Sequence, residues 1–201
     1  LNKKLPLNIN IEKFNKKEKI KKQVEKINKK IEKEGLKTPK IEASKLNSDL
    51  FPPCIKNIIS GVEKGERNFT VSVVLTAFIS HARFIPEKDD ALLNDCVRNI
   101  DYALNEIMPI IEKAANNTSP PLFEDQPTEK ENIYATLGLD KEGNINPNGK
   151  WYIPPNCESI EMKTSVCNPD KYCKEKDIKN PLSYYIKKKI KNYKEKDKKD
   201  N

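Results

Sequence analysis

The chain has 201 residues and a formal net charge of +8 at neutral pH. This length allows one ordinary domain with extensions, or two small domains. No apolar run approaches the roughly 20 residues of a transmembrane helix, and the N-terminal sequence LNKKLPLNIN lacks the apolar core of a signal peptide. We therefore expect a soluble, intracellular protein that does not enter a membrane.

The positive charge is concentrated at the two ends. Residues 1–34 contain twelve Lys and five Glu, and residues 174–201 contain eleven Lys and five acidic residues, whereas residues 35–173 carry a net charge of −5. An acidic middle between Lys-rich ends suits the binding of a polyanion, but it equally suits solvated tails. Because the chain begins with Leu1 rather than Met, we also expect a fragment of a longer protein.

The first third of the chain predicts a helix, a linker and a second helix. Residues 11–34 place Ile and Val at spacings of three and four, which is typical of one amphipathic helix. Residues 35–50 then read as a hinge or linker with irregular structure. A short helix is expected to follow Cys54 and to end near two glycines, Gly61 and Gly65.

The middle of the chain predicts further helices. Residues 69–84 hold β-branched side chains that favour a strand, but their length and lack of strict alternation favour a buried helix, which we expect. Residues 91–115 predict one helix, kinked or broken at Pro109. Cys96 lies on the apolar side of this predicted helix, where it would pack as a small hydrophobic residue. The apolar positions that predict it are Leu93, Val97, Ile100, Leu104, Ile107 and Ile111.

The remaining segments are poorer in apolar periodicity. Residues 116–150 are rich in Pro, Asn and Gly, so we expect mostly loop there. The tail from Lys187 is Lys-rich and is expected to be helical at first and disordered later.

Five cysteines make an odd set, and three of them lie within seventeen residues: Cys157, Cys167 and Cys173. A reducing compartment disfavours disulfides, so this grouping favours a metal or cofactor site. The spacing lacks the paired C-x2-4-C of zinc fingers and the C-x2-C-x2-C run of bacterial ferredoxins. A fourth ligand must come from elsewhere in the chain. The candidates are Cys54, Cys96 and His81.

Two of these cysteines follow rigid proline turns, in LFPPCIKNII and in YIPPNCESIEMKTSVCNPDKYCKEKDIKNPLSYY. Together the two segments resemble the C-terminal iron–sulfur domain of the large subunit of archaeal and eukaryotic DNA primase. In that family one Cys follows a Phe-Pro-Pro turn. The other three lie beyond a helical insertion, in a segment that ends in archaeal members with Asn/His-Pro-Leu-x-Tyr-Tyr. The resemblance covers roughly residues 50–186.

The resemblance implies a mainly α, irregular helical domain organised around a [4Fe–4S] cluster, with a long loop region and Lys-rich termini. It divides the chain into residues 1–48 (a basic amphipathic helix and linker), 49–186 (the iron–sulfur domain) and 187–201 (a Lys-rich tail). A bound cluster would hold segments together that are distant in the sequence. Its role would be either structural alone or also redox. The implied ligands are Cys54, Cys157, Cys167 and Cys173.

The resemblance also implies a non-catalytic role in DNA replication. Such a domain binds template DNA and the 5′-triphosphate end of the RNA primer, and a catalytic small subunit holds the polymerase activity. The sequence itself has no phosphate-binding G-x4-GK[ST] loop and no Asp-x-Asp pair. The small subunit would dock on a region absent here. The implied location is cytoplasmic for an archaeal protein and nuclear for a eukaryotic one. The alternatives are a zinc-stapled interaction module and a redox enzyme.

Two groups of residues are candidates for nucleic-acid binding, which needs cations for phosphates and aromatic rings for bases. The family usually places a His and an Arg on the helix after the first cysteine, but Phe69 and Ser72 stand there in this chain. We expect nearby residues to replace them. The alternative for His81 is a capping or packing role, and the alternative for Trp151 is core burial. For Lys187, Lys188 and Lys189 the alternative to phosphate contacts is a solvated helix end. The candidates are Lys64, Arg67, Asn68, His81 and Arg83 in the first group, and Lys150, Trp151 and Tyr152, near Tyr134, in the second.

Overall fold

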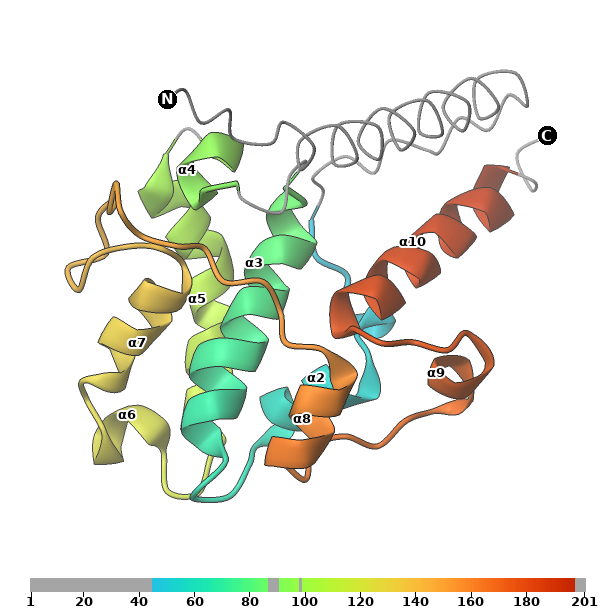
Figure 1. Ribbon diagram of the computed structural model, residues 1–201, viewed down its shortest axis with the longest axis horizontal. Helices are drawn as coiled ribbons and strands as arrows, with labels where there is room; N and C mark the ends of the chain where they lie inside the picture. The colour runs from blue at the N-terminus through green and yellow to red at the C-terminus, as the bar shows by residue number, and fades with distance from the viewer. Residues whose placement is uncertain (1–44, 87–90, 98, 198–201) are drawn as a thin grey trace, which may run out of the picture. The chain divides into compact units, whose positions relative to one another are not determined.

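A computed structural model describes residues 45–86, 91–97 and 99–197 (Figure 1). The chain divides into two units, Leu1–Lys40 and Ile41–Asn201, and all described residues belong to the second. The helix predicted for residues 11–34 lies outside the described residues. The described elements are η1 (Ser48–Leu50), α2 (Pro53–Ser60), η2 (Asn68–Leu75), α3 (Thr76–Phe84), α4 (Leu93–Cys96), α5 (Ile100–Asn116), α6 (Leu122–Asp125), α7 (Glu129–Thr136), α8 (Cys157–Lys163), α9 (Lys171–Glu175) and α10 (Pro181–Asp197).

The predicted mainly α class is confirmed, because the described residues form helices and only isolated β-bridges. None of the described helices is long and apolar enough to cross a bilayer.

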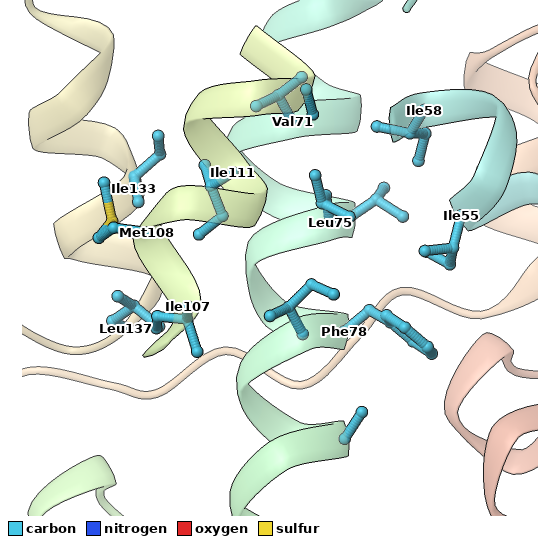
Figure 2. Close-up of a cluster of buried hydrophobic side chains, with 14 of the residues drawn as sticks. Ile55, Ile58, Val71, Leu75, Phe78, Ile107, Met108, Ile111, Ile133 and Leu137 are labelled. Atoms are coloured by element: carbon cyan, nitrogen blue, oxygen red, sulfur yellow. The ribbon is translucent and has the colours of Figure 1, made fainter. Parts of the chain in front are cut away.

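The apolar run at residues 69–84 is helical, as predicted, and forms the centre of the domain. It consists of η2, a π-helix, followed directly by α3. Figure 2 shows Leu75 and Phe78 of this run between Ile55 of α2 on one side and Ile111 of α5 on the other. All four side chains are fully buried. A helix surrounded by other elements has no solvent face to mark its period, which explains why the sequence pattern was ambiguous.

The prediction of a single helix over residues 91–115 is wrong, because the chain is extended at Val97. A new helix, α5, begins after Asn99, whose side chain accepts a hydrogen bond from the Tyr102 N–H at 3.1 Å. This cap satisfies a backbone donor that a continuous helix would have satisfied itself. Pro109 lies inside α5, which continues through it between the buried residues Met108 and Ile111, so tertiary packing outweighs the proline penalty.

Residues 116–150 are mostly loop, as predicted, but two short helices, α6 and α7, lie within them. Leu122 and Ile133 explain these short helices, since each is fully buried in the core. Their helical order thus depends on packing against α5 and η2 and not on local propensity.

An aromatic cluster joins the two ends of the described domain. The Tyr185 ring of α10 lies 5.7 Å from the Phe51 ring and 5.9 Å from the Phe78 ring, and the latter two rings are 5.3 Å apart. The Tyr185 hydroxyl also accepts a hydrogen bond from the Asn47 N–H at 3.2 Å. Edge-to-face aromatic pairs of this kind are stabilising beyond the area they bury. Tyr185 therefore fixes α10 against the start of the domain.

Helices α3 and α5 are joined by an ion pair. The Arg83 guanidinium donates through Nη2 to Glu106 Oε1 at 3.0 Å, and the ion pair also places Nε 2.5 Å from Oε2. The hydrogen bond from Arg83 lowers the pKa of Glu106 below its ordinary value of 4.5, although partial burial acts in the opposite direction.

We expect Glu106→Gln to reduce the acid dependence of stability. Because the folded-state pKa of Glu106 is lowered, the ion pair contributes fully above pH 4.5, and its contribution is lost as the pH falls through the lowered pKa. Thermal unfolding from pH 7 to acid pH should therefore show a smaller loss of stability for Glu106→Gln than for the wild type. Equal losses in the two proteins would show that the ion pair does not contribute.

Candidate metal centre and nucleic-acid surface

Four cysteines from well-separated parts of the sequence line one cavity of about 420 Å³. Cys54 lies in the first turn of α2, Cys157 begins α8, Cys167 lies in the following loop, and Cys173 lies in α9. None of the four is in a disulfide. The fifth, Cys96, packs against the hydrophobic core and does not line the cavity.

The proline turn before Cys54 explains its fixed position. Pro53 occupies the first turn of α2, where its fixed φ angle suits a helix start and its missing N–H costs nothing. Pro52 and Pro53 also line the cavity. Cys54 is only 8 % exposed, so its thiol faces the interior of the domain.

Cys157 is held by hydrogen bonds at the start of α8. The Asn156 side chain caps this helix by accepting from the Ser159 N–H at 2.8 Å. The Cys157 N–H donates to the Lys179 carbonyl oxygen, also at 2.8 Å. The second bond joins α8 to the segment that leads into α10.

The loop that carries Cys167 is tied to the beginning of the domain. The Glu66 carboxylate accepts from the Ser165 N–H at 2.9 and 3.0 Å and from its hydroxyl at 3.0 Å. The Asn57 side chain donates to the Val166 carbonyl oxygen at 3.0 Å. These bonds hold the residues directly before Cys167 beside α2.

Cys173 is positioned by Asp170, which caps α9. One Asp170 carboxylate oxygen accepts from the Cys173 N–H, and the other accepts from the Tyr184 hydroxyl, each at 2.7 Å. Asn180 joins neighbouring segments by donating to the Pro154 carbonyl oxygen at 2.9 Å. The residues of the NPLSYY motif thus support the cavity through hydrogen bonds and packing, and none of them lines it except Pro181.

The environment of the thiols disfavours their ionisation when no cation is near. Burial raises the pKa of Cys54 to about 12, and the neighbouring Cys157 and Cys167 act in the same direction. Burial and the Asp170 carboxylate raise the pKa of Cys173 to about 11. A metal centre binds thiolates and not thiols, so loading the cavity would release protons.

The four thiols are suited to a metal centre. Thiolates are the usual ligands of structural zinc, which can bind four of them, and of iron–sulfur clusters, which are held by cysteines. A cavity of about 420 Å³ has room for such a centre.

Arg67 lies inside the domain, which argues against the phosphate contact expected from the sequence. Its side chain is fully buried, and its guanidinium donates to the Asp125 carboxylate and to the Pro120 carbonyl oxygen. The neighbouring Asn68 donates to Glu129 at 2.8 Å. These bonds join η2 to the segment that contains α6 and α7.

Three further candidates have structural contacts in the interior. Trp151 is 5 % exposed and donates through Nε1 to the Ser80 hydroxyl at 2.9 Å. Its ring lies 4.1 Å from the ring of His81, which is equally buried and whose Nδ1 lies 3.0 Å from the Ala77 carbonyl oxygen. Arg83 is occupied by Glu106. Core packing, the alternative that the sequence left open for Trp151 and His81, is the arrangement found.

Three candidates remain at the surface, and one cation was missed. Lys64, Lys150 and Tyr152 are exposed. Lys163 of α8 was not predicted, and its Nζ lies 4.9 Å from the centroid of the Phe69 ring. No sequence signal joined these two residues, because they lie far apart in the chain and meet only in the folded domain.

The sequence comparisons identify the family. Residues 44–198 match the family model that describes the C-terminal domain of the large subunit of eukaryotic and archaeal DNA primase. The chain belongs to this family.

The relatives it matches are archaeal. The chain is 45 % identical over 162 residues to the DNA primase large subunit PriL of Pyrococcus horikoshii, covering 77 % of this chain and 41 % of that protein. It is 45 % identical over 152 residues to PriL of Thermococcus kodakarensis, covering 72 % and 38 %, and 41 % identical over 160 residues to PriL of Methanothermobacter thermautotrophicus, covering 73 % and 36 %. The chain thus spans about two fifths of these relatives' length. No solved structure gives a significant match.

We expect Arg67→Ala to destabilise the domain. Removing one partner of a buried ion pair typically costs about 3–5 kcal/mol. Because Asp125 is one-third exposed, we expect about 3 kcal/mol in urea denaturation, near the lower end of that range. The control is Lys64→Ala, which removes an exposed cation and should change stability by less than about 0.5 kcal/mol. An Arg67→Ala protein of wild-type stability with weakened nucleic-acid binding would instead support a direct contact.

Proposed function

We propose that the chain binds a [4Fe–4S] cluster through Cys54, Cys157, Cys167 and Cys173. The observation that carries this proposal is the convergence of these four cysteines on one cavity, in a chain of the primase large-subunit family. When bound, the cluster supplies iron–thiolate bonds between α2 and the C-terminal segment. Hydrogen bonds accepted by Glu66 and Asp170 hold the backbone beside Cys167 and Cys173 in place for it.

The decisive measurement is the visible absorption, iron content and sulfide content of protein purified without oxygen. We expect broad visible absorption from thiolate-bound iron and about four irons per chain. A colourless protein that contains one zinc ion would overturn the cluster and favour the zinc-stapled interaction module.

We expect Cys167→Ser to lose the cluster and to unfold more readily. A serine hydroxyl is a poor replacement for a thiolate ligand, and cofactor binding that requires the folded state also stabilises it. The matched control is Cys96→Ser, which removes a thiol outside the cavity and should retain full iron content. Equal iron content in both variants would exclude Cys167 as a ligand.

We further propose that this domain is an accessory part of a DNA primase that binds template DNA and the 5′-triphosphate end of the RNA primer. Membership of the family supports this role. The exposed residues Lys64, Lys150, Tyr152 and Lys163, with the half-buried Phe69 ring beside Lys163, provide groups suited to phosphates and unpaired bases. Polymerisation, and assembly with a catalytic small subunit, are proposed for the full-length complex.

We expect two surface substitutions to weaken binding of single-stranded template in different ways. Lys150→Ala should reduce the slope of log affinity against log salt concentration by about one, since it removes one phosphate contact. Tyr152→Ala should cost about 1–3 kcal/mol of binding by loss of base stacking, with little change in the salt slope. Both are measured by fluorescence anisotropy over a salt series.

The control for both variants is Lys141→Ala, which removes an exposed cation paired with Glu142. It should bind template as the wild type does. If Lys150→Ala and Lys141→Ala reduced affinity and salt slope equally, the effect would reflect net charge and not a contact at Lys150.

A further inference from the structure

A second pocket lies between α10 and the segment around η1, and it contains no cysteine. Its volume is about 210 Å³. None of its described lining residues is acidic. Two are lysines, two are asparagines, two are tyrosines and one is a leucine. The lining residues are Lys45, Asn47, Leu50, Tyr185, Lys189, Asn192 and Tyr193.

Lys189 lines this pocket, and among the described residues its buried ammonium group has no hydrogen-bond acceptor. The residue is 5 % exposed. Its Nζ lies over the Tyr185 ring, 5.8 Å from the ring centroid. A buried charge without a partner is costly, so lysines at such positions are normally paired. Lys189 is thus a donor of three hydrogen bonds that the described part of the chain leaves unused.

The surrounding charges do not neutralise Lys189. Burial lowers its pKa, and the positive charge of Arg83 on the adjacent α3 lowers it further. Glu106 of α5 is bound by Arg83 and hydrogen-bonds Tyr102, and its carboxylate also attracts Lys45. Lys45 adds another positive charge to the wall of the pocket. The pocket therefore has an excess of positive charge and of hydrogen-bond donors.

We propose that this pocket binds a phosphate group, held by Lys189 and Lys45 with the amides of Asn47 and Asn192. Its volume equals that of about seven water molecules at roughly 30 Å³ each, which is enough for one tetrahedral oxyanion with some water. Lysine binds phosphate as a point charge, and an anion on the Lys189 ammonium would satisfy its unused donors. The phosphate can belong to a nucleic-acid backbone or to a small free phosphate, because the same donors recognise both.

The test uses the whole chain with its native cofactor content and inorganic phosphate as the probe. We expect phosphate to raise the unfolding temperature of the wild type above that in chloride at equal ionic strength, because a ligand of the native state stabilises it. Lys189→Met should weaken phosphate binding about tenfold or more, since it removes a charged hydrogen-bond donor. The matched control is Lys194→Met, an exposed lysine of the same helix that should bind phosphate as the wild type does.

A second variant distinguishes loss of phosphate binding from a change in folding caused by Lys189→Met. Asn192→Asp keeps Lys189 but adds a carboxylate to the pocket, and it should also abolish the phosphate effect. Absence of a phosphate effect on the wild type, or an equal effect in Lys189→Met, would overturn the proposal. Neither result would bear on the cysteine cavity, because visible absorption and iron content report the cluster separately.

A second experiment, with single-stranded DNA, distinguishes a backbone phosphate of nucleic acid from a small free phosphate. If Lys189→Met also weakens DNA binding and inorganic phosphate competes for that part of the affinity, the pocket binds a backbone phosphate. If DNA binding is unchanged while phosphate binding is lost, the pocket binds a small phosphate. Both results support a phosphate site.

Discussion

The arrangement of this domain depends on joining α2 to a C-terminal segment more than one hundred residues away in the chain. Bringing such distant segments together has an entropic cost that local structure cannot offset. The contact of Tyr185 with Phe51 and Phe78 provides the apolar part of the join. The bonds from the Ser165 N–H to Glu66 and from the Asn57 side chain to the Val166 carbonyl oxygen provide the polar part. The four thiols share one cavity because these contacts place their backbones together.

Two buried cations, Arg67 and Lys189, differ in whether the described residues give them a hydrogen-bond acceptor. Arg67 is fully buried and donates to Asp125 and Pro120, so its charge joins two parts of the structure. Lys189 is also shielded from solvent, but the described residues give its ammonium no acceptor. A paired buried charge is a structural contact, whereas an unpaired one lining a pocket indicates a ligand of opposite charge.

The residues that most resemble a functional motif in the sequence act as supports in the structure. Asn180 and Tyr184 bind the backbone and the helix cap beside the cysteines, and Trp151 donates to Ser80 in the core. The surface that we propose for nucleic acid is consequently made of less distinctive residues, such as Lys150 and the Lys163–Phe69 pair. A hydrogen-bonded, buried group has a fixed position but cannot also bind a ligand from solution.

The sequence by itself determined the helical class, the family and the grouping of cysteines as a candidate site, because proline turns and cysteine spacing are local features of the chain. It did not determine the break at Val97 or the helices α6 and α7, since these depend on caps and core packing. Nor could it separate Arg67 from Lys64, because burial is decided by which residues meet across the fold. The tertiary structure decided which cations are interior supports and which can contact a ligand.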